Sequence, residues 1–123
     1  MAGDAFELCR LDDLADPGSR AVTIGKGDWP VRGFVVRQGA RAYAYVNRCP
    51  HAGFPLDGAP NRFLHQEESL IQCAVHGALF SIESGYCVAG PCSGKSLTAI
   101  AVKVIAGVVV LEEDPDALAL RHA

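Results

Sequence analysis

The chain has 123 residues, of which 50% are hydrophobic and 20% are charged. This length and composition fit one globular domain, and they exclude a disordered chain, a fibrous chain and two ordinary domains. The formal net charge is -3, which argues against a nucleic-acid-binding protein, because binding the phosphate backbone requires a basic face.

No segment of the sequence has the length and hydropathy of a membrane span. The best apolar run, residues 104–111, is bracketed by Lys103 and Glu112 and is far shorter than the roughly 20 residues that a spanning helix needs. The first residues include Asp4 and Glu7 and have neither a basic start nor a long apolar stretch. Because no secretory signal is visible, we expect a cytoplasmic protein that binds no membrane.

Short apolar segments with β-like alternation predict strands through most of the chain. In the first half, residues 6–11 and 21–24 predict strands that are separated by a turn region at residues 12–19. Residues 31–36 and 41–46 then predict a hairpin that turns at Gln38 and Gly39. Near the other end, residues 97–105 and 108–111 predict a second hairpin around Ala106 and Gly107.

Only residues 116–122 fit a short helix, which Asp114 or Asp116 could cap. The sequence therefore predicts an all-β fold. Between the two hairpins, residues 47–96 contain four prolines, four of the five cysteines and three of the four histidines. We predict a single domain, residues 1–123, in which a loop-rich subdomain at about residues 47–96 is inserted in a β base. Loops on a rigid scaffold are where binding chemistry is concentrated.

Two short motifs in this subdomain combine a thiol with an imidazole. The first is Cys49-Pro50-His51, a C-x-H pattern, and the second is Cys73-Ala74-Val75-His76, a C-x-x-H pattern that Gly77 follows. In each motif, one or two intervening residues in a tight turn allow both side chains to converge on one site. The odd number of cysteines and the expected reducing compartment favour metal or redox chemistry over a disulfide framework.

Two thiolates and two neutral imidazoles can hold zinc tetrahedrally, or an iron–sulfur cluster in which two histidines replace two cysteines on one iron. Zinc fingers separate their two cysteines by about two to four residues and their two histidines by about three to five. Here each motif is mixed, which suits a two-metal cluster better. A zinc-stabilised interaction domain remains an alternative at this point.

With these motifs the sequence resembles the Rieske [2Fe-2S] proteins, whose pattern is C-x-H followed by C-x-x-H-G. Phe80, Gly85 and Gly90-Pro91 match the continuation found in small Rieske ferredoxins. The resemblance implies stacked antiparallel sheets with a cluster-binding subdomain, in which a proline-containing third loop covers the cluster.

The resemblance also implies a ligand set for a Rieske-type [2Fe-2S] cluster. Cys49 and Cys73 would bind the buried iron, and His51 and His76 would bind the outer iron near solvent. The exposed edge of these two imidazoles would be the place where partner proteins dock and electrons leave.

The departures from respiratory Rieske proteins concern the cluster's potential. Those proteins carry an additional cysteine in each cluster loop, and a serine and a tyrosine that donate hydrogen bonds toward cluster sulfur. This sequence lacks the additional cysteines, and Ala78 and Phe80 occupy the positions of the two donors. Because fewer hydrogen bonds stabilise the reduced cluster less, we expect a low potential.

The resemblance implies an electron carrier rather than an enzyme. We expect it to pass electrons from a flavin reductase to a terminal oxygenase, as the ferredoxin component of a multicomponent dioxygenase system. After the cluster has taken two histidines, only His65 and His122 remain for a non-haem iron site, and no glycine-rich dinucleotide motif follows a strand. A Rieske subunit or redox-sensing module of a larger complex is the alternative.

Several further residues admit both a functional and a purely structural interpretation. Cys87 and Cys92 could form a redox pair, although packing of the third loop is the simpler interpretation. Phe54 and Phe63 could shield the cluster, form the rim of the docking surface or belong to the core, and Cys9 is expected in the core.

Overall fold

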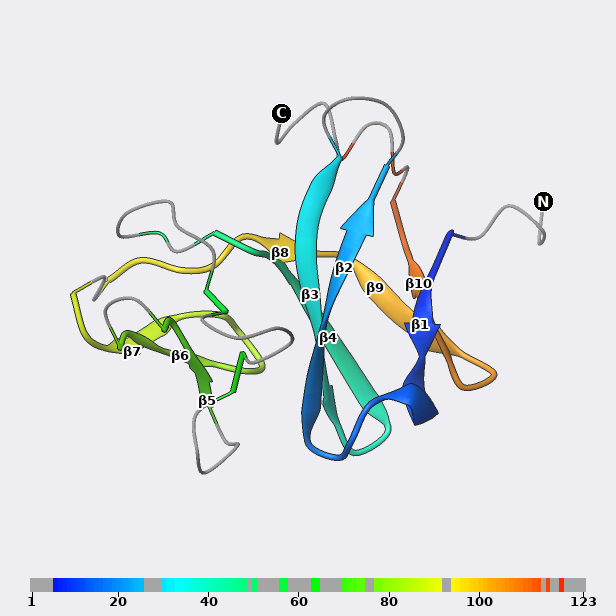
Figure 1. The fold of residues 1–123 in the computed structure, drawn as a ribbon, viewed down its shortest axis with the longest axis horizontal. Helices are drawn as coiled ribbons and strands as arrows, with labels where there is room; N and C mark the ends of the chain where they lie inside the picture. Colours follow the sequence, from blue (N-terminus) through cyan, green and yellow to red (C-terminus); the bar gives the residue numbers. More distant parts are fainter. Residues whose placement is uncertain are drawn as a thin grey trace.

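The computed structural model describes residues 6–25, 30–48, 50, 56–57, 63–64, 70–74, 77–91, 94–113, 115 and 118 of the chain. These residues form an all-β fold, as the sequence predicts, and their strands make three antiparallel sheets (Figure 1). In this part of the chain, no helix is long and apolar enough to cross a membrane.

The central sheet has four strands in the order β2-β3-β4-β8. Its bounds are β2 (Gly18–Ile24), β3 (Val31–Gln38), β4 (Arg41–Val46) and β8 (Ala99–Ile100). The predicted hairpin is confirmed as β3 and β4, which pair from Gly33↔Val46 to Gln38↔Arg41. Strand β2 begins three residues earlier than the sequence predicts, because its first residues already pair with the far end of β3.

The terminal sheet combines strands from both ends of the chain in the order β1-β10-β9. Its bounds are β1 (Phe6–Arg10), β10 (Val108–Leu111) and β9 (Val102–Ile105). Strands β9 and β10 form the second predicted hairpin, and both turn residues, Ala106 and Gly107, have positive φ angles of 51° and 78°. Positive φ at both turn residues is the requirement of a tight type I′ turn.

The prediction of one continuous strand over residues 97–105 is wrong. The chain changes sheets at Ala101: β8 before it pairs with β4, whereas β9 after it pairs with β10. The Ala101 N–H donates to Glu113 Oε2 (3.1 Å) and its C=O accepts from the Glu112 N–H (2.9 Å). These bonds replace the hydrogen bonds between strands at the point where the chain passes from one sheet to the other. The alternation of side chains continues through Ala101 and does not reveal this crossover.

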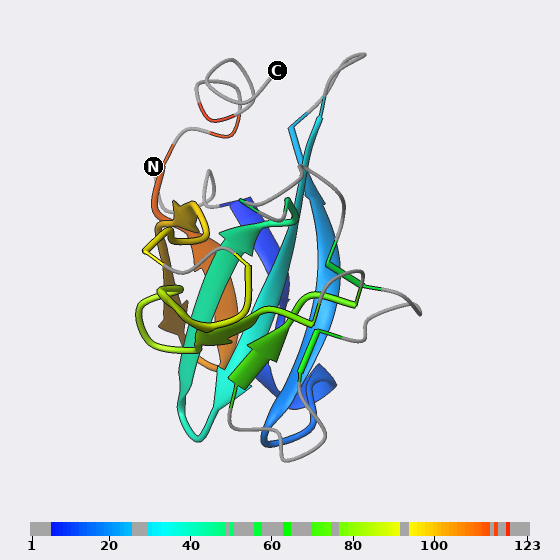
Figure 2. The same ribbon diagram turned by 90° about the vertical axis from the view of Figure 1, so that its left-hand side faces the viewer.

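The small sheet lies to one side of the other two sheets and has the order β5-β6-β7 (Figure 1). Its bounds are β5 (Leu70–Gln72), β6 (Leu79–Ser81) and β7 (Cys87–Ala89). All three strands fall within residues 47–96, where the sequence analysis predicts the loop-rich subdomain. In Figure 2 they lie nearest the viewer, in front of β3 and β4.

The central sheet is the middle layer, because its side chains are buried on both faces. Phe34 and Val36 enter a first core that is shared with the small sheet, and Val35 enters a second core that is shared with the terminal sheet. Two covered faces explain the continuous apolar run of β3, since a half-exposed strand would alternate with polar residues. The first core comprises Phe34, Val36, Tyr45, Leu56, Phe63, Ile71, Cys73, Ala78, Phe80, Ile82, Cys87 and Leu97.

This packing decides the interpretation of Phe63 and bears on one residue of the predicted C-terminal helix. Phe63 is fully buried and stacks on Phe34, with ring centroids 4.3 Å apart and planes at 7°, so it is a core residue and does not form an exposed rim. Pro115 and Leu118 are helical, and Leu118 is buried in the second core. The other residues of the predicted C-terminal helix, together with both proposed caps, lie outside the described residues.

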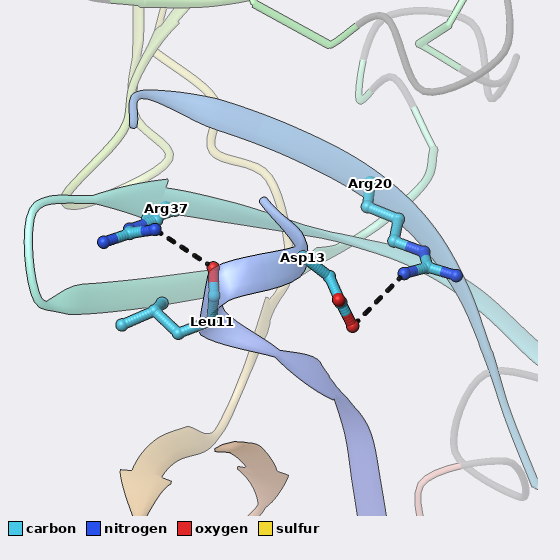
Figure 3. A network of polar contacts seen from close by, with 4 residues as sticks. All are labelled: Leu11, Asp13, Arg20 and Arg37. Carbon is cyan, nitrogen blue, oxygen red and sulfur yellow. Dashed lines mark hydrogen bonds and ion pairs between the residues drawn. The ribbon is translucent and has the colours of Figure 1, made fainter. Parts of the chain in front are cut away.

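A cluster of polar contacts ties the start of the chain to the far end of the β3–β4 hairpin (Figure 3). The 3-10 helix η2 (Leu11–Asp13) follows β1. Arg37 Nη1 donates to the carbonyl oxygens of Leu11 (3.2 Å) and Leu14 (3.1 Å). The exposed pair of Arg20 and Asp13, 3.9 Å apart, adds little stability.

Truncation of the stacked ring tests the first core. We expect Phe63→Ala to lower the free energy of unfolding by about 3–5 kcal/mol, because it leaves a cavity between two sheets. Ile105→Ala is the matched control, since Ile105 is 48% exposed and its loss is expected to change stability by no more than about 0.5 kcal/mol. Chemical denaturation measures both; equal effects would contradict this placement of the ring.

Candidate metal centre

Of the four predicted ligands, Cys73 lies in the described part of the chain. It follows the last residue of β5 and is completely buried in the first core. Cys49, His51 and His76 lie outside the described residues, so their convergence on one site stays a prediction. Within the described residues, no group of three His, Cys, Asp or Glu side chains is placed to hold a metal ion.

The second motif forms a closed loop between two paired strands. The Cys73 N–H donates to the Ala78 carbonyl oxygen (2.9 Å), and the Gly77 N–H donates to the Cys73 carbonyl oxygen (2.8 Å). The antiparallel pairing of β5 with β6, from Gln72↔Leu79 to Leu70↔Ser81, holds both ends of this loop. The tight turn predicted for C-x-x-H-G is therefore confirmed at its two described ends.

The loop of the first motif is closed by the side chain of Asn47, two residues before Cys49. The Leu56 N–H donates to Asn47 Oδ1 (2.7 Å), and Asn47 Nδ2 donates to Asp57 Oδ1 (3.0 Å). The sequence analysis did not single out Asn47. The available signal was an Asn directly after a strand, where its side chain commonly bonds to loop backbone.

A backbone hydrogen bond between described residues joins the two loops. The Ala74 N–H, adjacent to Cys73, donates to the carbonyl oxygen of Leu56 (2.8 Å). Leu56 is completely buried, so this bond is shielded from water. The end of the first loop and the start of the second loop therefore lie side by side, which suits two ligand pairs that share one site.

The first residue of the third loop packs closely against the end of the second motif. Gly90 follows β7 with a φ of 104°, and a Cβ atom there would lie 2.7 Å from Ala78 Cα. Such a separation is below any real Cβ contact, so only glycine allows the two backbones to approach this closely. The third loop therefore starts directly against the residue that follows the second motif, whereas its predicted role as a cover over the cluster stays a prediction.

The remaining cysteines have different surroundings. Cys87 is buried, its thiol is free, and its Sγ–H donates to the Ala89 carbonyl oxygen (3.2 Å). The packing interpretation therefore holds for Cys87, whereas Cys92 lies outside the described residues. Cys9 is partly buried against the second core, and this burial raises the pKa of its thiol. Phe54, His65 and His122 also lie outside the described residues.

Tyr45 connects the central sheet to the turn between β6 and β7. Its hydroxyl donates to the carbonyl oxygen of Ile82, and a Cβ atom at Gly85 would lie 2.7 Å from its ring. Burial raises the pKa of Tyr45 to about 12, and the negative charge of Glu83 adds to the rise. The neutral phenol therefore holds the small sheet against β4.

The described residues fit a metal centre at Cys73. This thiol has an apolar environment, where a lone thiolate would be costly and a metal-bound thiolate would not. Its loop is closed by backbone hydrogen bonds and bonded to the end of the other motif's loop. The donor set of the sequence, two Cys and two His in mixed pairs, matches the chemistry of a Rieske-type cluster.

A family model for the Rieske [2Fe-2S] domain matches residues 4–114. Because this match covers most of the chain, the protein belongs to the Rieske [2Fe-2S] domain family, and its cofactor is a Rieske-type [2Fe-2S] cluster. This result decides against the zinc alternative that the motifs alone left open. No curated protein sequence matches the chain.

Solved structures of ferredoxins are similar to this chain over nearly their whole length. The ferredoxin of carbazole 1,9a-dioxygenase from Nocardioides aromaticivorans IC177 is 27% identical, with a TM-score of 0.68 over 89% of this chain and 98% of that chain. A ferredoxin of Sphingomonas yanoikuyae B1 is 22% identical, with a TM-score of 0.69 over 90% of this chain and 100% of that one.

A terminal oxygenase matches as well, but over part of its length. The terminal oxygenase of carbazole 1,9a-dioxygenase from Nocardioides aromaticivorans IC177 is 24% identical, with a TM-score of 0.70 over 93% of this chain. Only 32% of the oxygenase chain takes part in this match. The likeness therefore shows that the two chains share a fold.

Substitution of Gly90 tests the contact between the third loop and the second motif. We expect Gly90→Ala to destabilise the protein by about 2 kcal/mol or more, because it combines backbone strain with a backbone clash. Gly94→Ala is the control: its φ is 87°, but a Cβ atom there meets nothing within 4 Å. Thermal unfolding and visible absorption measure stability and cluster content, and equal losses in both variants would contradict the close contact.

The raised pKa of Tyr45 predicts a loss of stability in alkali. Between pH 10 and pH 12 the unfolded chain releases the phenolic proton while the folded chain keeps it. The stabilisation is therefore complete below about pH 10 and is lost as the pH rises through about 12. Tyr45→Phe should flatten the fall in stability over this interval, measured by chemical denaturation, and an unchanged slope would contradict the assignment.

Proposed function

We propose that this chain is an electron carrier that takes one electron from a flavin reductase and delivers it to a terminal oxygenase. The supporting observation is the extent of the similarity: the chain matches 98% and 100% of the length of two ferredoxins, but 32% of a terminal oxygenase. A bound Rieske-type cluster supplies one-electron chemistry. We assign the chain no catalytic step, and we place it in the cytoplasm as a single domain over residues 1–123.

We propose Cys49, His51, Cys73 and His76 as the ligands. The two thiolates would hold one iron and the two imidazoles the other. The hydrogen bond from Ala74 to Leu56 supports this assignment, because it brings the two ligand-bearing segments together. All of them belong to the proposed cluster-binding subdomain at about residues 47–96, which also contains β5, β6 and β7.

Buried apolar side chains next to the second motif support a low potential. Ala78 and Phe80 are completely buried and have no side-chain donor. The nearby thiol of Cys87 donates to a backbone carbonyl oxygen instead. A reduced cluster with few hydrogen bonds to its sulfurs is less stabilised, so the chain should accept electrons only from a strong reductant.

The proposed docking surface is the exposed edge at His51 and His76. A small, transient interface suits a carrier that must meet two partners in turn. A complex of reduced oxygenase with oxidised ferredoxin is known for a carbazole 1,9a-dioxygenase whose matching chain is 24% identical to this one. We extend to this chain the proposal of a protein partner of the same kind.

A second candidate is a Rieske subunit or redox-sensing module that stays within a larger complex. The match to part of a terminal oxygenase favours it. So does an exposed apolar pair at the start of β7: Tyr86, just before the strand, is 48% exposed, and Val88, on the strand, is 52% exposed. Stable copurification with a large subunit would support this candidate over a diffusing carrier.

A redox titration followed by electron paramagnetic resonance tests the carrier proposal. We expect a Rieske-type signal with a potential near the lower end of the family range of about -150 to +300 mV. Electrons should also flow through the purified protein from a flavin reductase to an oxygenase. A clearly positive potential, or no electron flow with any reductase, would contradict the proposed role.

In the same titration, Ala78→Ser should raise the potential by on the order of 60 mV, because one added hydrogen bond stabilises the reduced state by about 1.4 kcal/mol. Phe80→Tyr should act in the same direction. Phe80→Leu changes the same side chain without adding a donor, so its potential should stay close to that of the unmodified protein.

A further inference from the structure

We propose that Asn47 is a positioning residue that sets the separation of the two ligand-bearing loops and thereby determines how firmly the cluster is held. The proposal rests on the ligand set proposed above, and it assigns Asn47 no direct contact with the cluster. Its basis is a continuous series of hydrogen bonds from the central sheet to the residue beside Cys73.

The series begins on the central sheet. Asn47 follows the last residue of β4, and its N–H donates to the carbonyl oxygen of Arg32 on β3 (2.8 Å). The next residue, Arg48, turns back with an N–H that donates to the Val46 carbonyl oxygen (2.8 Å). The backbone of Asn47 is therefore fixed by the sheet just before the first motif begins.

Both ends of the Asn47 amide then reach across the first loop. Its oxygen accepts the Leu56 N–H and its nitrogen donates to the Asp57 carboxylate, at 2.7 Å and 3.0 Å. The amide provides an acceptor and a donor on two separate atoms, whereas an ionised carboxylate at position 47 would lack the donor. The two partners are nine and ten positions after Asn47 in the sequence, and the whole first motif lies between.

Leu56 links Asn47 to the second loop through its two backbone hydrogen bonds. Its N–H is held by Asn47, and its carbonyl oxygen accepts the Ala74 N–H (2.8 Å). Leu56 is also completely buried in the first core, where an amide that has lost its partner is costly. Loss of the Asn47 side chain should therefore displace Leu56, and with it the register between the two loops.

The experiment measures how fast the cluster is released from the purified holoprotein. Visible absorption is followed in the presence of an iron chelator, well below the unfolding temperature. We expect Asn47→Ala to release the cluster about tenfold faster than the unmodified protein. Hydrogen exchange of the Leu56 and Ala74 amides in the holoprotein should accelerate as well, while that of Val35 in the centre of β3 should not.

A charge-conserving exchange provides the rescue. Asn47→Asp alone keeps an acceptor for Leu56 but sets a second carboxylate against Asp57, so it should also accelerate release. The double variant Asn47→Asp/Asp57→Asn reverses the donor and the acceptor at the same net charge. It should bring the release rate and the Leu56 exchange rate back to within about twofold of the unmodified protein.

Arg37→Met is the matched control for a general loss of stability. Arg37 also bridges two backbone groups of a distant segment, at the opposite end of the hairpin from Asn47 (Figure 3). This variant should lower the unfolding temperature and leave cluster release within about twofold. If Asn47 only contributed to overall stability, the rate of cluster release in Asn47→Ala and in Arg37→Met would increase in proportion to the loss in unfolding temperature.

The outcomes separate the two proposals. An Asn47→Ala protein that keeps the release rate and the Leu56 exchange rate of the unmodified protein overturns the positioning role, and so does a double variant that is no better than Asn47→Asp. An unmodified protein that binds no [2Fe-2S] cluster instead refutes the ligand set and the carrier function, whatever the exchange rates are.

Discussion

The burial of the β3–β4 hairpin on both faces is the constraint on which the other elements depend. Phe34 and Val36 point toward the small sheet, while Val35 points toward the terminal sheet. The middle of β3, residues 33–36, is buried on both faces and has no polar side chain, which makes the central sheet the layer against which two separate cores pack. The small sheet and the terminal sheet each bury their apolar side chains against one face of this layer.

Individual polar side chains at the end of β4 hold described segments of the predicted cluster-binding subdomain to the central sheet. Tyr45 bonds to the turn after β6, and Asn47 bonds to the end of the first loop, both from the same strand end. An electron carrier forms and breaks no substrate bond. The proposed carrier role therefore requires ligands held in fixed positions, and tethered segments on a rigid sheet suit this requirement.

Local patterns predicted the strands well where pairing is local and failed where partners are distant. The hairpin of β3 and β4 and the turn at Ala106 and Gly107 follow from alternation and turn residues alone. The exchange of sheets at Ala101 does not, because the alternation of side chains runs through it while the hydrogen-bond partner changes. In the same way, Phe63 could be a rim or a core residue until its stacking on Phe34 was known.

The sequence by itself determined which residues are available for the proposed chemistry: the two mixed Cys and His motifs, the glycines around them and the absence of donors at Ala78 and Phe80 are readable without a structure. These features are local, since each motif spans only a few residues. Only the tertiary structure decided which segments meet, such as Ala74 with Leu56 and Gly90 with Ala78. The physical reason is that these contacts depend on how the layers pack, and no pattern within either segment encodes the identity of its distant partner.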